Sequence, residues 1–141
     1  MHALIKKTKV VALIFLCAML ISGCASQPGL ERKEGVSRVY DATFEDVKAA
    51  SRHSVETLNV KINRIEDRSP GEHWIWFVKP VSAWSWGEYG LVKVAAAESG
   101  AVVEVSTDKS YKLQVTGTGQ DEFAEAIFSG IEQGLKDLAS Q

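Results

Sequence analysis

Two stretches of the chain repeat apolar residues at the three- and four-residue spacing of an amphipathic helix. The first covers about residues 43–58, and its apolar face is formed by Phe44, Val47, Ser51, Val55 and Leu58. Thr43 and Asp46 stand in the register of a capping box, which predicts that the helix begins at Thr43. Asn59 is the expected end.

The second helical stretch covers about residues 120–139. Its apolar stripe is formed by Phe123, Ile127, Ile131, Leu135 and Leu138, widened by Ala124 and Phe128. Acidic residues gather in its first turns, where they favour the positive end of the helix dipole. Gly130 and Gly134 have the spacing of a GxxxG packing face; outside a membrane we expect them to contact the sheet closely or simply to be tolerated.

The remaining folded stretches alternate apolar and polar residues, the pattern of half-buried β-strands. They begin near Val36, Val60, His73, Tyr89, Ala101 and Tyr111. In the first, Val36 and Tyr40 share a face with Arg38, opposite Ser37 and Val39, and the pattern leaves open which face is buried. The turn signals DRSPGE and ESG, and an expected tight turn at residues 108–110, separate the later ones.

This order of elements predicts a single α+β domain over residues 36–141. We expect an antiparallel sheet of four to six strands with two amphipathic helices on one face, in β-α-β-β-β-β-α order.

The stretch HWIWFVKPVSAWSWG, residues 73–87, contains all four tryptophans of the chain. Trp74 and Trp76 should point to one side of a strand, and Ile75 and Phe77 to the other. Both faces of this strand are therefore apolar, although a sheet with helices on one side exposes its second face to water. We expect something to cover that second face.

Trp84 and Trp86 also share a side, and a turn near residues 79–82 would bring the two tryptophan pairs together. One interpretation is an indole ladder that completes the core. The functional alternatives use the four tryptophans as an interaction surface for the membrane interface, for an envelope protein or a second copy of the chain, or, least favoured, for a glycan.

The first 24 residues follow the pattern of a secretory signal: three lysines, an uncharged apolar run over residues 10–21, and small residues before Cys24. Twelve apolar residues form only about 18 Å of helix, which is short of the roughly 30 Å hydrocarbon core of a bilayer. A permanent membrane span is therefore disfavoured.

Ile21, Ser22, Gly23 and Cys24 resemble the lipobox of bacterial lipoproteins. The resemblance implies a signal peptide over residues 1–23 and a diacylglyceryl group on the Cys24 sulfur, with acylation of its new amino group. Two or more fatty chains anchor a protein stably where one does not. Ala25 replaces the Asp that resembles an inner-membrane retention signal in Gram-negative bacteria. The expected location is the periplasmic leaflet of the outer membrane.

Loss of residues 1–23 removes three lysines and no acid, which leaves 13 basic against 18 acidic residues. This acidic balance argues against a nucleic-acid partner. Cys17 leaves with the signal and Cys24 is modified, so no thiol remains for a disulfide or for catalysis. The polar residues that follow, up to Gly35, predict a flexible tether over residues 24–35.

The element order over residues 36–139, with the opening VYDATFEDVKAA, resembles small proteobacterial lipoproteins of unassigned function. More distantly, it resembles the helix-grip domains of BamC-type lipoproteins of outer-membrane protein assembly. The positions that carry this resemblance are Tyr40, Phe44, Val47, Ala50 and Gly71. The tryptophan cluster is not part of it.

The residues that could support catalysis do not form a recognised motif. His53 and His73 are not at metal-ligand spacing, and there is no HExxH or CxxC motif. Glu66 and Asp67 are neighbours on a strand and should point to opposite faces. GTGQ, residues 117–120, is weak evidence for an anion cradle at a helix start. We expect no enzyme activity, no metal site and no cofactor.

These observations together predict a lipoprotein that is anchored through Cys24 and acts as a binding or envelope-assembly accessory module, through the sheet edge or the tryptophans. The alternative is a carrier or sensor, in which the helices grip an apolar small molecule, a lipid or a glycan against the sheet.

Overall fold

The computed structural model describes residues 28–82, 87–110 and 118–140. The elements along them are α2 (Pro28–Glu31), β1 (Val36–Tyr40), α3 (Phe44–Thr57), β2 (Lys61–Ser69), β3 (Glu72–Lys79), β4 (Glu88–Ala96), β5 (Ala101–Lys109) and α4 (Gln120–Ala139). The strands form one antiparallel sheet in the order β1-β5-β4-β3-β2. The predicted α+β class is therefore confirmed.

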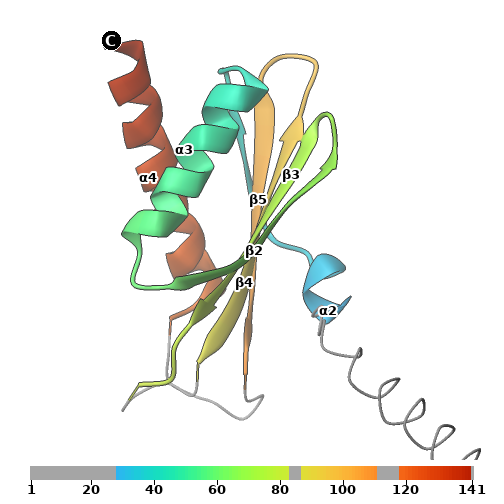
Figure 1. Ribbon diagram of the computed structural model, residues 1–141, viewed down its shortest axis with the longest axis vertical. Coiled ribbons are helices and arrows are strands. Elements are labelled where there is room, and N and C mark those ends of the chain that lie inside the picture. The colour runs from blue at the N-terminus through green and yellow to red at the C-terminus, as the bar shows by residue number, and fades with distance from the viewer. Residues whose placement is uncertain (1–27, 83–86, 111–117, 141) are drawn as a thin grey trace, which may run out of the picture.

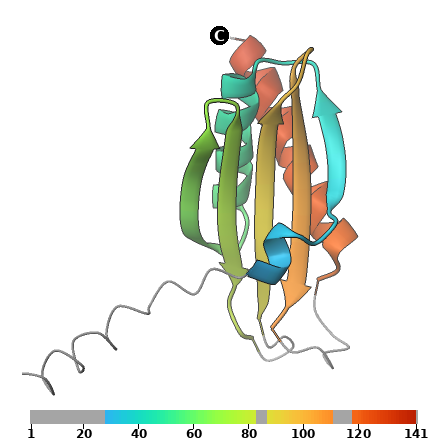
Figure 2. The ribbon, with the colours of Figure 1, turned by 90° about the vertical axis from the view of Figure 1, so that its right-hand side faces the viewer.

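The sheet separates two unequal layers. Strands β2 to β5 form a meander, and β1 pairs with the free edge of β5. Helices α3 and α4 lie together on one face of the sheet, as expected (Figure 1). The short helix α2 lies on the opposite face (Figure 2), and its presence contradicts the prediction of a flexible tether through residue 35.

Both long helices occupy the predicted ranges because each carries a local sequence signal, a capping residue in α3 and an apolar stripe in α4. The Thr43 hydroxyl caps α3, accepting a hydrogen bond from the backbone N–H of Asp46 at 3.2 Å. The apolar stripe of α4 is buried through Ile131. Leu135 is partly buried against the core, but Leu138 is 43% exposed, so the stripe ends one turn earlier than the pattern predicts.

The two glycines of α4 contact α3 rather than the sheet, which corrects our expectation. A Cβ at Gly130 would lie 2.2 Å from the Ser54 Oγ, and a Cβ at Gly134 would lie 3.2 Å from the Ala50 Cβ. The Ser54 hydroxyl donates a hydrogen bond to the Ile127 carbonyl at 2.8 Å. The helices approach closely because both present small residues at their crossing.

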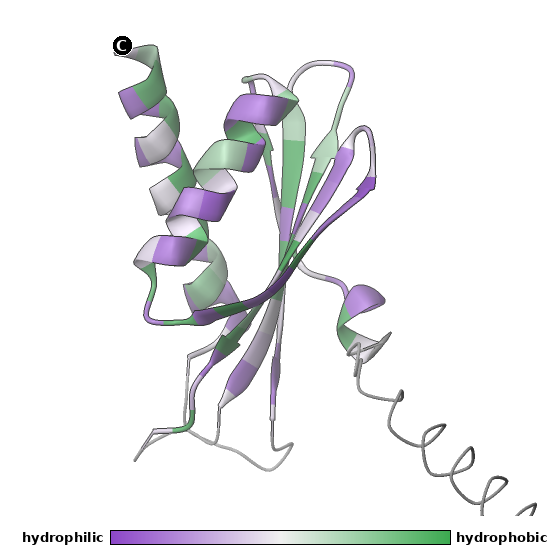
Figure 3. Ribbon diagram, viewed as in Figure 1, coloured by the Kyte–Doolittle hydropathy of each residue, from purple (hydrophilic) through white to green (hydrophobic). Residues whose placement is uncertain are grey.

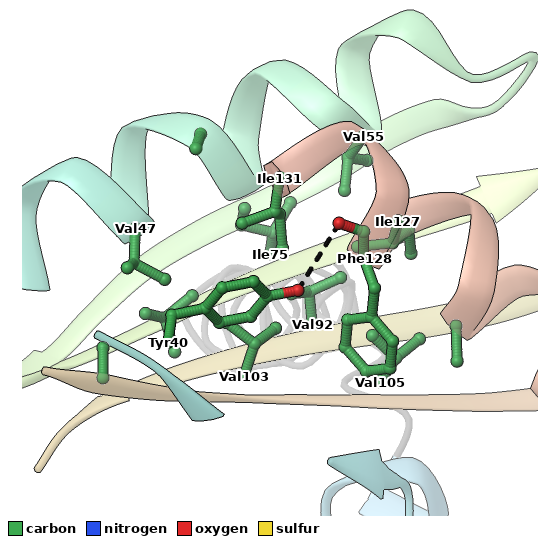
Figure 4. Packing of buried hydrophobic residues seen from close by; sticks show 14 of the residues in the cluster. Tyr40, Val47, Val55, Ile75, Val92, Val103, Val105, Ile127, Phe128 and Ile131 are labelled. Carbon is green, nitrogen blue, oxygen red and sulfur yellow. Dashed lines mark hydrogen bonds between the residues drawn. The ribbon is translucent and has the colours of Figure 1, made fainter. Parts of the chain in front are cut away.

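Side chains fill the space between the helices and the sheet (Figure 4). Val47 and Val55 from α3 and Ile127, Phe128 and Ile131 from α4 are all fully buried there. They pack on a layer of strand residues formed by Ile75, Phe77, Val92, Val94, Ala101, Val103 and Val105. This layer is the hydrophobic core of the domain.

The structure resolves the ambiguous first strand: its core face carries Tyr40, which is 6% exposed, while Val39 on the other face is 68% exposed. The Tyr40 hydroxyl donates a 3.5 Å hydrogen bond to the Phe128 carbonyl (Figure 4). Beside it, Arg38 reaches α4 and forms ion pairs with Glu125 and Glu132 at 3.0 and 2.8 Å. These contacts join β1 to the helix layer.

Two details of the strands differ from the predicted alternation. In β2 a register shift falls between Ile62 and Arg64, so Ile62 pairs with Phe77 on the core face while Arg64 pairs with Trp76 on the opposite face. Strand β5 continues to Lys109, which overturns the expected turn at residues 108–110. The further strand expected from Tyr111 lies outside the described residues.

Candidate functional site

Strand β3 divides its aromatic residues between the two faces of the sheet, as its sequence predicts. Ile75 and Phe77 are buried in the main core. Trp74 and Trp76 lie on the opposite face, where Trp76 packs with Leu30 and Leu91 in a second buried cluster, flanked by Trp74 and Tyr89. We call this surface, formed by Trp74, Trp76, Tyr89 and Leu91, the indole face. Trp84 and Trp86, the other predicted members, lie outside the described residues.

Cationic side chains lie over both described indoles. The Arg64 guanidinium is 4.8 Å from the centre of the Trp76 ring, and that of Arg68 is 4.2 Å from the Trp74 ring. The Lys93 ammonium is 5.4 Å from the Trp74 ring. These cations are attracted to the negative faces of the rings, so the indole face combines apolar and positively charged chemistry.

Helix α2 lies on the indole face. Leu30 is 1% exposed and packs against Trp76 and Leu91. The Lys93 ammonium donates to the Glu31 carbonyl at 3.1 Å, the Ser106 hydroxyl donates to the Lys33 carbonyl at 3.2 Å, and the Lys33 ammonium donates to the Thr107 carbonyl. The second apolar face of the sheet is therefore partly covered by a segment that we expected to be a tether.

Glu31 completes a ring of four charges at the edge of this contact. Arg68 lies 3.0 Å from Glu31 and 2.9 Å from Glu66; Arg64 lies 3.1 Å from Glu66 and 3.9 Å from Glu31. All four side chains are between about a quarter and two fifths exposed. Each acid thus contacts both arginines, and Glu31 reaches the pair from a different element.

Trp76 leaves one polar atom without a partner. Its ring N–H is buried, and no acceptor lies within hydrogen-bond distance among the described residues. The Trp74 N–H, in contrast, donates to the Glu72 carboxylate at 2.7 Å. An unpaired buried N–H costs about 1–3 kcal/mol. Helix α2 therefore covers Trp76 without supplying an acceptor for this N–H.

His73 is adjacent to Trp74 in sequence but lies on the other face, away from the indoles. Its Nδ1 is 2.7 Å from the Asp67 carboxylate, which also lies 3.0 Å from the Lys48 ammonium. Hydrogen bonds from His73 and Lys48 lower the pKa of the Asp67 carboxyl. Glu66 and Asp67 point to opposite faces, as predicted, since Glu66 pairs with the arginines of the indole face.

The His73 Nε2 is buried and has no hydrogen-bond partner among the described residues. The imidazole is almost completely buried, and the Asp67–His73 pair joins β2 to β3. His53, the other histidine considered, is an exposed residue of α3.

A cavity of about 320 Å³ opens beside the end of β5, lined by Lys33, Glu88, Thr107, Asp108, Lys109, Thr118 and Gln120. Glu88 is 1% exposed, and its carboxylate oxygens lack hydrogen bonds among the described residues, although the Lys79 ammonium is 3.9 Å away. The Gln120 side chain accepts a 3.2 Å hydrogen bond from the Thr107 N–H. In the GTGQ segment, which the sequence indicated only weakly as an anion cradle, Gly117 lies outside the described residues, and the Gln120 side chain is directed at β5.

Sequence reasoning identified the indoles but missed the residues around them. Arg64, Glu66 and Arg68 follow the two-residue period of a strand face, and this spacing could have indicated them. Leu30 is the one leucine of residues 25–35 and could have been singled out in the same way.

Among the described residues no helix is both long and apolar enough to cross a bilayer, and no group of three or more acidic, histidine or cysteine side chains is placed to hold a metal ion. No protein-family model matches the chain, and no curated protein matches it.

Proposed function

We propose that this protein is a bacterial lipoprotein, anchored through Cys24 in the periplasmic leaflet of the outer membrane, whose domain acts as a non-catalytic binding module beside the bilayer. The ISGC sequence after an uncharged apolar run carries the anchoring part of the proposal. The indole face carries the binding part.

The position of α2 supports a module held close to its membrane. Helix α2 begins at Pro28, and the chain from Cys24 to Pro28 spans at most about 14 Å when fully extended, at roughly 3.3–3.6 Å per residue. A flexible tether up to Val36 would allow about three times that distance. With α2 docked, the binding surface therefore remains within a short distance of the lipid headgroups.

The chemistry of the indole face supports binding of another molecule. Aromatic and arginine side chains are the residues most enriched at the energetic centres of protein interfaces, and this face places Arg64 and Arg68 on two indoles. Glycan stacking would require ring faces that are free, but these are overlain by cations, and so we favour a protein partner.

Two alternatives are less well supported. A carrier would hold an apolar molecule between helices and sheet, but core side chains such as Val55, Val92 and Ile127 occupy that space. A catalytic role for the Asp67–His73 pair would require the buried Nε2 to be accessible.

The anchoring proposal is tested by mass spectrometry of the native protein after expression in a Gram-negative host. We expect a chain that begins at residue 24 with acyl groups on Cys24, and a Cys24→Ser variant that keeps its signal and loses the acyl groups. Cys17→Ser is the matched control, because this cysteine lies inside the expected signal, and it should be processed normally. A native chain that begins elsewhere, or that lacks acyl groups, contradicts the proposal.

The outer-membrane location is tested separately by membrane fractionation. Ala25→Asp creates the retention signal that the wild-type sequence lacks, so this variant should move to the inner membrane while remaining acylated. An unchanged distribution, or wild-type protein in the inner membrane, contradicts the outer-membrane assignment.

A further inference from the structure

The indole face and α2 together indicate what kind of partner this surface accepts. We propose that the indole face is a docking site for a partner polypeptide that presents an aliphatic residue followed directly by a carboxylate, and that Leu30 and Glu31 of α2 occupy this site in cis. This inference deepens the proposed binding function and rests on its assignment of the binding surface, but it does not depend on lipidation.

The cis segment defines the chemistry of the site. Leu30 fills an apolar position between Trp76 and Leu91, and its side chain is almost completely buried. The next residue, Glu31, places its carboxylate 3.0 Å from Arg68 and 3.9 Å from Arg64. An aliphatic side chain with a neighbouring acid therefore matches the site in both shape and charge.

The attachment of α2 is small enough for a partner to replace it. The helix has four residues and contributes a single side chain, Leu30, to the buried cluster on this face. The ion pairs around it are partly exposed, and pairs of this kind contribute little to stability. A short segment held by one buried leucine, partly exposed ion pairs and three hydrogen bonds to β4 and β5 can be displaced without disturbing the core on the other side of the sheet.

An independent observation indicates that α2 is an incomplete occupant. Trp76 packs against Leu30 of α2, yet its buried ring N–H has no acceptor among the described residues. A backbone or side-chain oxygen of a longer partner segment would supply that acceptor. The partner would then make an interaction that the cis segment does not make.

Competition between cis and trans segments gives a direct test. The probe is a fluorescein-labelled peptide with the sequence of residues 27–35, QPGLERKEG, and its binding to the purified full-length protein is measured by fluorescence anisotropy. In the wild type the cis segment competes at an effective concentration in the millimolar range, which weakens binding of the peptide. The Leu30→Ala protein should bind the peptide at least about 10-fold more tightly than the wild type.

A second opening variant guards against a folding defect in Leu30→Ala. Glu31→Arg places a positive charge against Arg64 and Arg68 and should also release α2, with a similar rise in peptide affinity. Leu138→Ala is the matched control, because this leucine is exposed at the end of α4, and it should bind the peptide as weakly as the wild type. Far-ultraviolet circular dichroism checks that each variant is folded.

The peptide itself carries the specificity controls. Replacing its leucine by alanine, or its first glutamate by lysine, should each weaken binding to the opened protein by about 10-fold or more, the loss expected for an interface anchor. The proposal is overturned if neither opening variant binds the peptide more tightly than the wild type does, or if replacing the leucine of the peptide leaves its affinity unchanged. Binding of chitotetraose by the opened variants, with no binding of the peptide, would also overturn the choice of a polypeptide partner. The acylation state of Cys24 affects none of these outcomes, so failure here is separate from failure of the anchoring proposal.

Discussion

At the scale of single residues, the contact between the two long helices depends on glycine. Gly130 lies against Ser54, and Gly134 lies against Ala50 one turn away. The sequence shows the GxxxG spacing but not which element the glycines contact. The small residues of α3 lie among larger apolar ones, and they meet the glycines of α4 only once the two helices pack. Our expectation of contact with the sheet was wrong for this reason.

Gly130→Ala should therefore destabilise the domain although alanine is the better helix former. The added methyl group would lie 2.2 Å from the Ser54 Oγ and 2.8 Å from its Cβ, and overpacking of this kind costs about 1–3 kcal/mol. The gain in helix propensity is only about 1 kcal/mol. Urea unfolding monitored by circular dichroism measures the difference.

Gly134→Ala is the matched control for this substitution. Its new Cβ would meet the Ala50 Cβ at 3.2 Å, a contact that a shift of a few tenths of an ångström relieves. We expect a much smaller loss of stability, or a small gain. Equal effects at the two positions would contradict the assigned role of Gly130.

The buried Tyr40 hydroxyl predicts a distinct alkaline pH dependence. Burial raises the pKa of Tyr40 from 10.0 to about 12, against the opposing effect of Arg38. Because the unfolded state loses this proton at lower pH than the folded state, the associated stability is intact below pH 10 and is lost as the pH rises toward 12.

The comparison of wild type with Tyr40→Phe isolates this contribution. The phenylalanine variant loses only a long hydrogen bond, and its free energy of unfolding should fall less steeply than that of the wild type between pH 10 and 12. Denaturant unfolding at several pH values measures both slopes. Parallel curves would show that Tyr40 ionises alike in the folded and unfolded states.

At the scale of elements, the sequence predicted the helices that carry a local signal, such as a capping residue or an apolar stripe. Helices α3 and α4 begin within a residue of their predicted starts, because a capping residue and a periodic stripe are both local properties. The bulge in β2 was missed because it depends on pairing with β3, which moves Arg64 onto the indole face. Helix α2 has only four residues, too few to show an apolar period, and its Leu30 packs against Trp76 and Leu91, which lie far from it in the sequence.

The caps of the two long helices predict opposite responses to substitution. Thr43→Ala removes the hydrogen bond to the Asp46 N–H and should cost about 1 kcal/mol. Gly119, the N-cap of α4, has no side-chain cap, and a Cβ there would meet nothing within 4 Å. Gly119→Ser should therefore raise stability by a few tenths of a kcal/mol.

Thermal unfolding of both variants and the wild type in the same buffer measures these differences. A Thr43→Ala protein as stable as the wild type would contradict the capping role of Thr43. An apolar stripe therefore does not indicate how well a helix is capped, since α4 has the stronger stripe but lacks a side-chain cap.

At the scale of the whole molecule, the sheet is covered differently on its two faces. One face carries two amphipathic helices and the main core; the other carries a four-residue helix, two described indoles and a layer of charged side chains. Figure 3 shows a different contrast, across the width of the sheet, with hydrophilic residues along the edge strand β2 and more hydrophobic ones in the central strands. The sequence predicted that the second face needs a cover, but not that residues 28–35 supply it.

Helix α2 and the proposed lipid anchor at Cys24 are parts of one continuous segment, so release of α2 should also lengthen the proposed connection to the membrane. From Cys24, the extended chain reaches at most about 14 Å to Pro28 but about 42 Å to Val36, at roughly 3.5 Å per residue. A partner that displaces α2 would thus free the domain to move farther from the bilayer. The docking of Leu30 on the indole face would then limit how far the domain can lie from the bilayer.

Energy transfer in reconstituted vesicles can measure this coupling. Glu98 lies in the exposed β4–β5 turn, and Glu98→Cys provides a unique thiol for a donor dye once Cys24 is acylated; lipid-linked acceptors mark the bilayer surface. We expect transfer to fall when Leu30→Ala is added, because the domain then samples larger distances, while the Leu138→Ala control should match the parent protein. If transfer is the same with and without Leu30, α2 does not restrict the tether, and the proposed coupling between docking of α2 and distance from the membrane is contradicted.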